Sequence, residues 1–454
     1  MVHKFKQKDL NIVVDVNSGA IHVVDDIVYE CLEYYENFSK EEIVDKLSSE
    51  YDKNKVMEAL DEIDELKEAG VLFAEDTYIK DLNLDATEPV IKAMCLHVAH
   101  DCNLRCAYCF ASQGDYESCR SLMDVETGKK ALKYLVENSG SRRNLEVDFF
   151  GGEPLMNFDV CKELVTYGRS LEKEYNKLFR FTMTTNCVLL NEENMSYINE
   201  HMDNVVLSLD GRKEVNDKMR FRVDGSGSYD SIVPNIKKMV EKRGKGTYYV
   251  RGTFTKFNTD FAADVLHFAE LGFPSTSIEP VVAEPHHDYA LDDSDLPTVF
   301  EQYELLAEEL IKRKGTDQSF DFFHFTVDLT QGPCVVKRLR GCGAGAEYIS
   351  VTPEGDIYPC HQFVGNESFK IGHVDTGIEN RDLSMHFKKA NVLSKASCQE
   401  CWAKFYCSGG CHANAHNFNN DIFKPYELGC EMERKRLECS LYIQAKLMLE
   451  QSND

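Results

Sequence analysis

The sequence predicts an α/β protein with a partial (β/α)6 barrel at its centre and a smaller domain on each side. Six strand-like runs alternate with helical patterns between residues 90 and 290, an order that produces parallel strands joined by right-handed crossovers. A hairpin with three helices precedes this stretch, and a Cys-rich and Gly-rich stretch with little periodicity follows it. Because 454 residues exceed one ordinary domain, a division into several domains is expected.

The N-terminal segment predicts a small winged-helix domain. Two β-like runs flank a turn whose Asn17 and Gly19 suit a hairpin. Three helical patterns follow, and the second opens with a capping box formed by Ser39 and Glu42. The domain covers residues 1–80, its β-like runs 11–14 and 20–24, its helical patterns 26–35, 39 onward and 53–69, and its polar linker 76–89.

The central segment is expected to hold the active site, because parallel α/β folds gather functional groups at the carboxyl ends of their strands. The strand-like runs are 91–98, 146–150, 179–184, 205–209, 248–253 and 276–282. The helical patterns lie near 125–138, 158–176, 191–201, 229–243 and 259–271. The expected domains are the barrel at 90–290, a helical and acidic bridging region at 291–332, and the Cys-rich domain at 333–440.

The composition excludes several classes of protein. A formal net charge of −26 argues against nucleic-acid binding, which needs a basic surface. No run of about 18 apolar residues is present, so no membrane span is expected. The first ten residues are polar and charged, which is unlike a secretory signal. The sequence therefore predicts a cytoplasmic protein without nucleic-acid or membrane partners.

Cysteine is unusually frequent, with 17 residues. A reducing compartment makes a disulfide framework an unsuitable explanation. Cysteines that stand alone in the sequence are expected to be small buried hydrophobes, and clustered ones indicate metal binding. The isolated cysteines are Cys31, Cys95, Cys119, Cys161, Cys187 and Cys439.

The first cysteine cluster, Cys102, Cys106 and Cys109, directly follows the first predicted barrel strand. Its short spacing allows one loop to wrap three thiolates around a metal centre. A structural zinc site would need a fourth ligand. The candidates are His97, His100 and Cys119. A [4Fe–4S] cluster held by three cysteines would instead leave one iron open to a cofactor.

This Cys-x3-Cys-x2-Cys spacing, followed by the aromatic Phe110, resembles the radical S-adenosylmethionine (SAM) superfamily. The resemblance implies a TIM-like partial barrel whose open iron binds the amino and carboxylate groups of the methionine part of SAM. In that family, electron transfer breaks the S–C5′ bond of SAM and releases a 5′-deoxyadenosyl radical.

Motifs at the later strand ends support the same resemblance. Gly151, Gly152 and Glu153 resemble the family's GGEP motif, whose backbone groups hold the methionine amino group. Two adjacent glycines also let a ligand approach the backbone closely. The resemblance implies further SAM contacts from polar residues after the next two strands and from an arginine. These residues are Asn186, Ser208, Asp210 and Arg222, with Arg220 as the alternative to Arg222.

The second cysteine cluster resembles the SPASM extension of radical SAM enzymes, which holds two auxiliary [4Fe–4S] clusters. The resemblance therefore implies three clusters in all, and a zinc ribbon is the simpler alternative. The implied outer-cluster ligands are Cys398, Cys401, Cys407 and Cys430. The implied inner-cluster ligands are Cys342, Cys360 and Cys411. Either Cys334 is the fourth inner ligand, or that iron stays open for a substrate thiolate.

The whole chain resembles the maturases of short Cys-rich SCIFF peptides (six cysteines in forty-five residues), including its opening stretches 2–5 and 15–20. This resemblance implies thioether bonds between Cys sulfur and carbon in a ribosomally made peptide. It also implies that residues 1–80 bind the leader of that precursor as an added strand. The acidic composition of this domain argues against a DNA-binding winged helix. The implied electron donor is a reductase, a flavodoxin or a ferredoxin.

Other reactions remain open at this stage. Sulfatase-maturating relatives, which make formylglycine, carry an Asp directly after the cysteine that matches Cys360, where this chain has His361. Carbon–carbon crosslinking and epimerisation are further alternatives within the group. A non-enzymatic iron–sulfur redox sensor would need no SAM motifs. The catalytic base is not assigned, and Glu279, His361 and Tyr348 are the candidates.

Overall fold

The computed structural model describes residues 1–76, 90–116, 119–327 and 339–452. All but the first residue of the predicted linker at 76–89 lies outside the described residues, and so does Cys334. Within the described ranges, no helix combines the length and the apolar character that crossing a membrane requires.

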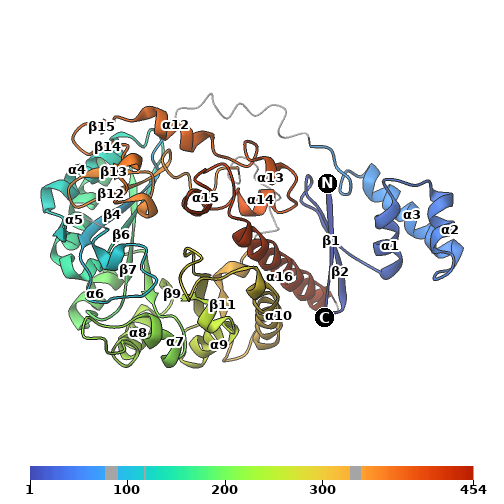
Figure 1. The fold of residues 1–454 in the computed structure, drawn as a ribbon, viewed down its shortest axis with the longest axis horizontal. Helices are drawn as coiled ribbons and strands as arrows, with labels where there is room; N and C mark the ends of the chain where they lie inside the picture. The colour runs from blue at the N-terminus through green and yellow to red at the C-terminus, as the bar shows by residue number, and fades with distance from the viewer. Residues whose placement is uncertain (77–89, 117–118, 328–338, 453–454) are drawn as a thin grey trace.

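The N-terminal unit is a three-stranded antiparallel sheet followed by three helices (Figure 1). The predicted hairpin is present as β2 and β3, and the capping box of Ser39 and Glu42 opens α2. The first strand, β1, was not predicted and pairs with β2. The elements are β1 Val2–Gln7, β2 Leu10–Asp15, β3 Ile21–Val24, α1 Asp26–Tyr34, α2 Lys40–Leu47 and α3 Lys53–Glu68.

The six predicted barrel strands are confirmed, and they lie side by side in one parallel sheet in sequence order. They are β4 Ala93–His100, β6 Asn144–Gly151, β7 Leu178–Thr185, β8 Asn204–Ser208, β9 Thr247–Phe254 and β10 Ser275–Pro280. Because the strands are parallel, their carboxyl ends meet at one edge of the sheet. The loops that carry the predicted site residues follow these ends.

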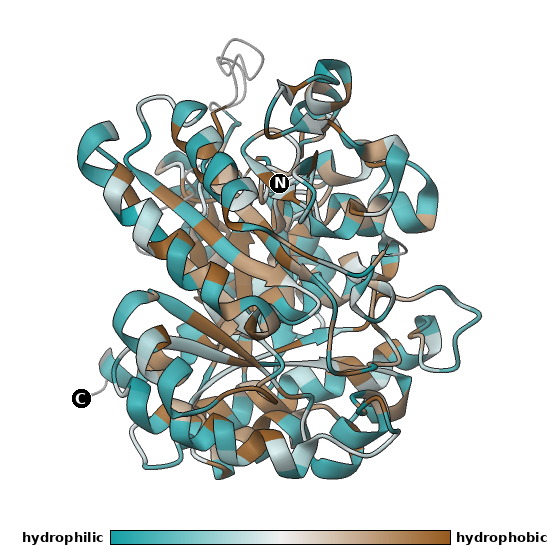
Figure 2. Ribbon diagram, turned by 90° about the vertical axis from the view of Figure 1, so that its left-hand side faces the viewer, coloured by the Kyte–Doolittle hydropathy of each residue, from teal (hydrophilic) through white to brown (hydrophobic). Residues whose placement is uncertain are grey.

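Helices cover the outer face of the sheet, as Figure 1 shows. They are α4 Val125–Glu137, α5 Phe158–Tyr175, α6 Glu192–His201, α7 Lys213–Met219, α8 Tyr229–Arg243, α9 Ala262–Glu270 and α10 Leu296–Arg313. The short helix α7 was not predicted. In Figure 2 the strands are largely brown and the outward faces of the helices largely teal, which is the amphipathic pattern of a helix-covered core.

Alternation along each strand separates the packed core from the inner face of the barrel. In β4, Met94 and Leu96 belong to the core under the helices, whereas the neighbouring Cys95 and His97 point the opposite way. The inner face therefore carries polar side chains on strands whose outer face is apolar.

Short strands extend the sheet at both edges. They are β5 Ser121–Leu122, β11 Asp321–Phe322, β12 Tyr348–Val351, β13 Asp356–Tyr358, β14 Gly372–His373 and β15 Gly377–Ile378. Strand β12 pairs in parallel with β4, so the Cys-rich region contributes to the barrel sheet itself. The sequence analysis did not predict these strands, because two to four residues are too few to show a period.

The Cys-rich region otherwise consists of short helices and loops and ends in one long helix. The helices are α12 Arg381–Lys389, α13 Ala396–Gln399, α14 Lys404–Cys407, α15 His412–Asn419 and α16 Glu427–Ser452. The 3-10 turns of the chain are η1 Ser112–Gly114, η2 Pro154–Asn157, η3 Lys256–Asn258, η4 Asp293–Asp295, η5 Phe323–Phe325, η6 His361–Phe363 and η7 Glu367–Phe369.

Helix α16 corrects the expectation of little periodicity after residue 333. It lies between α10 and the N-terminal strand β1 (Figure 1). Its apolar residues are spread around the helix because neighbours cover more than one face, so no single hydrophobic stripe marks it. His3 of β1 bonds Glu438 at 3.0 Å, and Gln7 contacts the thiol of Cys439 at 3.6 Å. The N-terminal sheet is thereby docked on α16.

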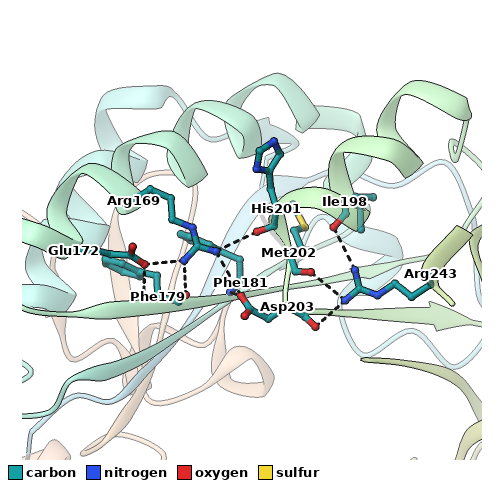
Figure 3. Close-up of polar contacts among 9 residues, drawn as sticks. All are labelled: Arg169, Glu172, Phe179, Phe181, Ile198, His201, Met202, Asp203 and Arg243. Carbon is teal, nitrogen blue, oxygen red and sulfur yellow. Dashed lines mark hydrogen bonds and ion pairs between the residues drawn. The ribbon is translucent and has the colours of Figure 1, made fainter. Parts of the chain in front are cut away.

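Two arginines fasten the amino-terminal edge of the sheet, opposite the predicted site (Figure 3). Arg169 of α5 donates to the carbonyl of Phe179 at 2.7 Å and to that of His201 at 3.2 Å. Arg243 of α8 donates to the carbonyls of Met202 and Asp203 at 3.0 and 2.7 Å. These bonds satisfy backbone oxygens that would otherwise be unpaired where helices turn into strands.

The isolated cysteines follow the expectation with one exception. Cys31, Cys95, Cys161, Cys187 and Cys439 are buried. Cys119 is exposed, so its prediction as a buried hydrophobe is wrong. It lies in a surface connection after η1, where its sequence gives no sign of burial or exposure.

Candidate functional site

The loop with the first cysteine cluster is held in place by backbone pairing. Arg105 N donates to the Phe221 carbonyl and Ala107 N to the Met219 carbonyl, both at 2.8 Å. These two bonds flank Cys106. The loop is therefore anchored to the segment after α7 on either side of its central thiol.

Gly151 and Gly152 bring the end of β6 against the start of this loop. Gly152 N donates to the Ala99 carbonyl at 2.8 Å, and Glu153 N donates to the Asp101 carbonyl at 2.9 Å. A Cβ on Gly151 would lie 2.2 Å from the Ala99 oxygen, and one on Gly152 would lie 2.1 Å from the Asp101 oxygen. Only glycine fits at these two positions, since any side chain would force the strand end away from the loop.

Glu153 joins the ends of two strands. Its carboxylate accepts bonds from Asn186 N at 2.7 Å, Thr185 Oγ1 at 2.8 Å and Leu155 N at 3.1 Å. It is fully buried, and burial raises the pKa of its carboxyl although these donors act in the opposite direction. Glu153 thus orients Asn186, whose amide reaches the cysteine loop through Asn103 Oδ1 at 2.7 Å.

Asp210 belongs to a buried network behind the cysteine loop. Tyr108 OH donates to Asp210 Oδ2 at 2.6 Å, and Arg220 donates to Tyr108 OH at 3.0 Å. Burial raises the pKa of the Asp210 carboxyl, and the nearby Arg220 opposes this shift. The buried Nε of Arg220 has no hydrogen-bond partner. A buried donor without a partner indicates that a ligand group completes the site.

A cavity of about 720 Å³ opens in front of this network. Its wall includes the three cysteines of the first cluster and most of the predicted SAM-binding residues. These are Cys102, Cys106, Cys109, Gly151, Gly152, Glu153, Asn186 and Ser208. Arg220 is also on this wall. Asp210 lies behind it, and the backbone of Arg222 pairs with Leu104. The geometry therefore favours Arg220 over Arg222 as the arginine that faces a ligand.

The same cavity reaches the second cysteine cluster. Cys407, Cys411 and Cys430 line its far side, together with His361. One continuous space thus connects cysteines that are about 300 residues apart in the chain.

A second cavity of about 260 Å³ is lined by the four predicted outer-cluster cysteines, Cys398, Cys401, Cys407 and Cys430. Burial raises the pKa of the Cys407 and Cys430 thiols to about 12. Thiols in such a place are neutral unless a metal centre takes them as thiolates. Four cysteines facing one cavity are the donor set of a [4Fe–4S] cluster. In the part of the chain that is described, no three His, Cys, Asp or Glu side chains converge tightly enough for a single metal ion.

The predicted inner-cluster cysteines also lie near one another. Burial raises the pKa of Cys342 and Cys360, and the neighbouring Cys411 raises both further. Cys411 faces the large cavity, so this set lies beside the substrate space. Cys334, the alternative fourth ligand, is outside the described residues.

The candidate bases differ in their environments. Burial alone would raise the pKa of Glu279, but His324 at 3.2 Å and then Arg251 and Arg436 outweigh it and lower the pKa to about 2. Glu279 is therefore an ionised partner in a charge network. Burial lowers the pKa of His361 to about 4, so its imidazole is neutral near pH 7. Tyr348 OH lies 3.3 Å from His361 Nδ1.

Sequence reasoning missed several residues on the cavity wall. Arg251 of β9 and Arg436 of α16 both face the cavity. Arg251 alternates with Val250 and Gly252 along its strand, so its inward position follows from the strand period once the strand is assigned. Arg436 gave no such signal, because α16 itself was not predicted.

The alternative zinc ligands do not converge with the first cysteine cluster. His97 is buried and bonds His100 at 3.1 Å and Ser350 at 3.0 Å. Cys119 is exposed and is not on the wall of the cavity. The three cysteines of the first cluster therefore lack the fourth side chain that a structural zinc site needs.

Residues 96–269 match the family model of the Radical SAM superfamily. This match spans the cysteine loop, the glycine pair and the strands that carry them. The barrel of the chain is therefore a radical SAM domain, as the first cysteine motif predicted.

Similar proteins are known beyond the barrel. The chain is 26% identical over 344 residues to the cysteine-type anaerobic sulfatase-maturating enzyme of Clostridium novyi, covering 70% of this chain and 87% of that one. The structure of anSMEcpe with bound AdoMet and Kp18Cys peptide matches with a TM-score of 0.64 at 18% identity, over 81% of this chain and 100% of that one. Streptococcus suis SuiB bound to precursor peptide SuiA matches with a TM-score of 0.50 at 15% identity, over 92% and 95%. At these identities the two structures show a shared fold.

Proposed function

We propose that this protein is a radical SAM maturase that joins Cys sulfur to carbon in a ribosomally made Cys-rich peptide. The observation that carries the proposal is the single cavity between the two cysteine clusters. A peptide residue in this cavity would lie between a SAM site and a site for accepting an electron or a thiolate. Mass spectrometry of the peptide before and after reaction tests the proposal.

The residues at the first cysteine cluster fit a bound cluster and SAM. Together these cofactors would supply a 5′-deoxyadenosyl radical, which removes a hydrogen atom from the acceptor residue. The polar wall around Gly151, Gly152 and Ser208 would hold the methionine amino group and the ribose. The unpartnered Nε of Arg220 would donate to the methionine carboxylate, which satisfies an otherwise orphaned buried donor.

The second cysteine cluster would hold two auxiliary [4Fe–4S] clusters. The outer set lines its own cavity, and the inner set faces the peptide space through Cys411. Closing a thioether releases one electron in excess of the bonds formed. A path through the auxiliary cysteines would carry this electron away from the peptide.

Sulfatase maturation is the second candidate, because the Clostridium novyi relative is such an enzyme. The residue after Cys360 argues against it. Here it is His361, whose ring packs 5.1 Å from that of Phe150 and 5.4 Å from that of Phe110. A neutral imidazole in an aromatic setting does not replace the aspartate base of that reaction. Carbon–carbon crosslinking and epimerisation remain outcomes of the same test.

Metal analysis provides the first prediction. Protein purified and reconstituted without oxygen is expected to hold about 12 iron and about 12 sulfide per chain, since three sets of cysteines each suit one [4Fe–4S] cluster. Replacing Cys398 and Cys401 together by Ala should remove about 4 of each. Zinc without sulfide in the wild-type protein would contradict both cluster assignments.

The N-terminal unit is proposed to bind the precursor leader along β3. This strand pairs only with β2 among the described residues, so its other edge is open. Opposite residues in antiparallel pairs alternate between bonded and non-bonded pairs. Asp15 N donates to the Ala20 carbonyl at 2.9 Å, and Val23 lies opposite Ile12, three positions further along. The N–H of Val23 therefore points away from β2, toward an added strand.

A proline at this position tests the leader site. Val23→Pro removes the outward N–H without removing a bond to β2, and an edge strand tolerates proline. We expect the affinity for a short Cys-rich precursor to fall by about tenfold or more, which is about 1.4 kcal/mol. Calorimetry with the peptide measures this change. Cleavage of SAM without peptide should be unchanged.

The matched control is Val23→Thr, which keeps both the β-branched shape and the N–H. It should bind the precursor like the wild-type protein. Equal binding by the proline variant would contradict the assignment of β3. A variant is preferable to deleting residues 1–80, because the deletion would also expose the face of α16 that β1 covers.

A further inference from the structure

Lys395 is a fully buried cation among the proposed auxiliary-cluster ligands. Its side chain is 1% exposed, and its Nζ donates to the Gly409 carbonyl at 2.7 Å. Among the described residues, no carboxylate lies within ion-pair distance of this ammonium. A buried charge without a counter-ion is strongly unfavourable unless other negative groups stabilise it. The fold therefore places an uncompensated positive charge here.

The negative groups that surround Lys395 are cysteine thiolates of both sets. Cys398, Cys407 and Cys430 belong to the proposed outer set, and Cys411 belongs to the proposed inner set. All four stabilise the charged form of Lys395, while burial opposes it and lowers its pKa. The ammonium thus lies where the fields of two cysteine sets overlap.

A single peptide group links Lys395 to Cys407. The Gly409 carbonyl faces the ammonium, and the N–H of Gly410, in the same peptide plane, faces the Cys407 thiol. In a trans peptide the oxygen and the hydrogen point in opposite directions. Ser408, Gly409 and Gly410 all have positive φ, between 62° and 89°, which turns this plane into position. The ammonium therefore polarises an amide that donates to a proposed cluster ligand.

We infer that Lys395 is a positioning residue that raises the reduction potential of the auxiliary clusters, and that of the outer cluster most. This inference rests on the cluster ligands assigned in the proposed function. An iron–sulfur cluster becomes more negative when it gains an electron, so a fixed positive charge stabilises the reduced form. Net charge and hydrogen bonds to sulfur are the established determinants of cluster potential.

The proposed consequence concerns electron flow. With Lys395 charged, an electron from the peptide reaches an acceptor that holds it more tightly. Without the charge, the same transfer becomes less favourable, although every cysteine ligand is still present. Lys395 contacts neither SAM nor peptide, so it acts only through the clusters.

The test is a redox titration followed by electron paramagnetic resonance on the full-length holoprotein. Replacing Cys102, Cys106 and Cys109 by Ala in every variant removes the signal of the first cluster. We expect Lys395→Met and Lys395→Gln to lower the midpoint of the outer cluster by at least 59 mV, which is a tenfold less favourable one-electron reduction. Lys395→Arg keeps the charge and should retain the wild-type midpoint more closely.

The variants separate charge from shape. Lys395→Gln can still donate to the Gly409 carbonyl, so a wild-type midpoint in this variant would overturn the role of the charge. Lys389→Met, on the exposed face of α12, is the matched control and should change nothing. If the neutral variants lose their clusters and Lys395→Arg retains them, the charge is required for assembly, which supports the inference. Loss of clusters in all three variants would indicate shape alone and overturn it.

The outcome for the wild-type protein distinguishes the two levels of the argument. Auxiliary signals that do not respond to Lys395 would refute the inference and leave the cluster assignment standing. A wild-type protein with no auxiliary signal and no auxiliary iron would refute the assignment itself.

Discussion

Cys106→Ala is expected to reduce SAM cleavage to the background rate while leaving the fold intact. Cys106 is the middle thiol of three on the cavity wall, and a [4Fe–4S] cluster with two ligands has no stable open-iron geometry. Burial raises the pKa of this thiol to about 12, so it becomes a thiolate only when metal binds. Production of 5′-deoxyadenosine under anaerobic reducing conditions measures the effect.

The backbone explains why the fold should survive this change. The flanking amides of Arg105 and Ala107 bond the segment after α7, and neither bond involves the Cys106 side chain. The circular dichroism spectrum and the melting temperature of the metal-free protein should therefore match those of the wild type. Cys119→Ala, at an exposed cysteine, is the matched control and should cleave SAM normally. Normal cleavage by Cys106→Ala would show that the cluster lies elsewhere.

The barrel could be predicted because its signals are long and repeated. Each strand, such as β6 or β7, has five or more residues with an apolar outer face, and each amphipathic helix follows a recognisable cap. Strand β12 has four residues and owes its position to pairing with β4, more than 240 residues earlier in the chain. Pairing over such a distance leaves no local period. The same holds for α16, whose apolar residues meet several partners.

The site was predictable where a backbone requirement restricts the residue type. Gly151 and Gly152 are the only residues that fit against β4, and the cysteine spacing is set by the ligands of a cluster. The choice between Arg220 and Arg222 could not be made from sequence. Both follow α7, and only the turn of the chain there places Arg220 on the cavity wall. Lys395 was not singled out, because one lysine near cysteines carries no pattern until its burial is known.

The product of the reaction is the prediction with the largest consequence for function. For each thioether, the precursor peptide is expected to lose two hydrogens and one alkylatable Cys. One hydrogen leaves the acceptor carbon as an atom, and the other leaves the Cys thiol as a proton. The remaining electron passes to the Cys-rich region, whose Cys411 faces the peptide space. Mass spectrometry with thiol alkylation, before and after reductant, measures both losses.

The alternatives give different results in the same experiment. A two-hydrogen loss with every Cys still alkylatable would indicate a carbon–carbon link or an oxidation. Loss of a sulfur atom would indicate formylglycine and would favour the sulfatase-maturating relatives. An unchanged mass with deuterium taken up from solvent would indicate epimerisation. Enzyme with Cys106→Ala is the control, since no modification should occur without SAM cleavage. The thioether proposal stands only if the bond resists reductant, because a disulfide causes the same two-hydrogen loss and is reversed by it.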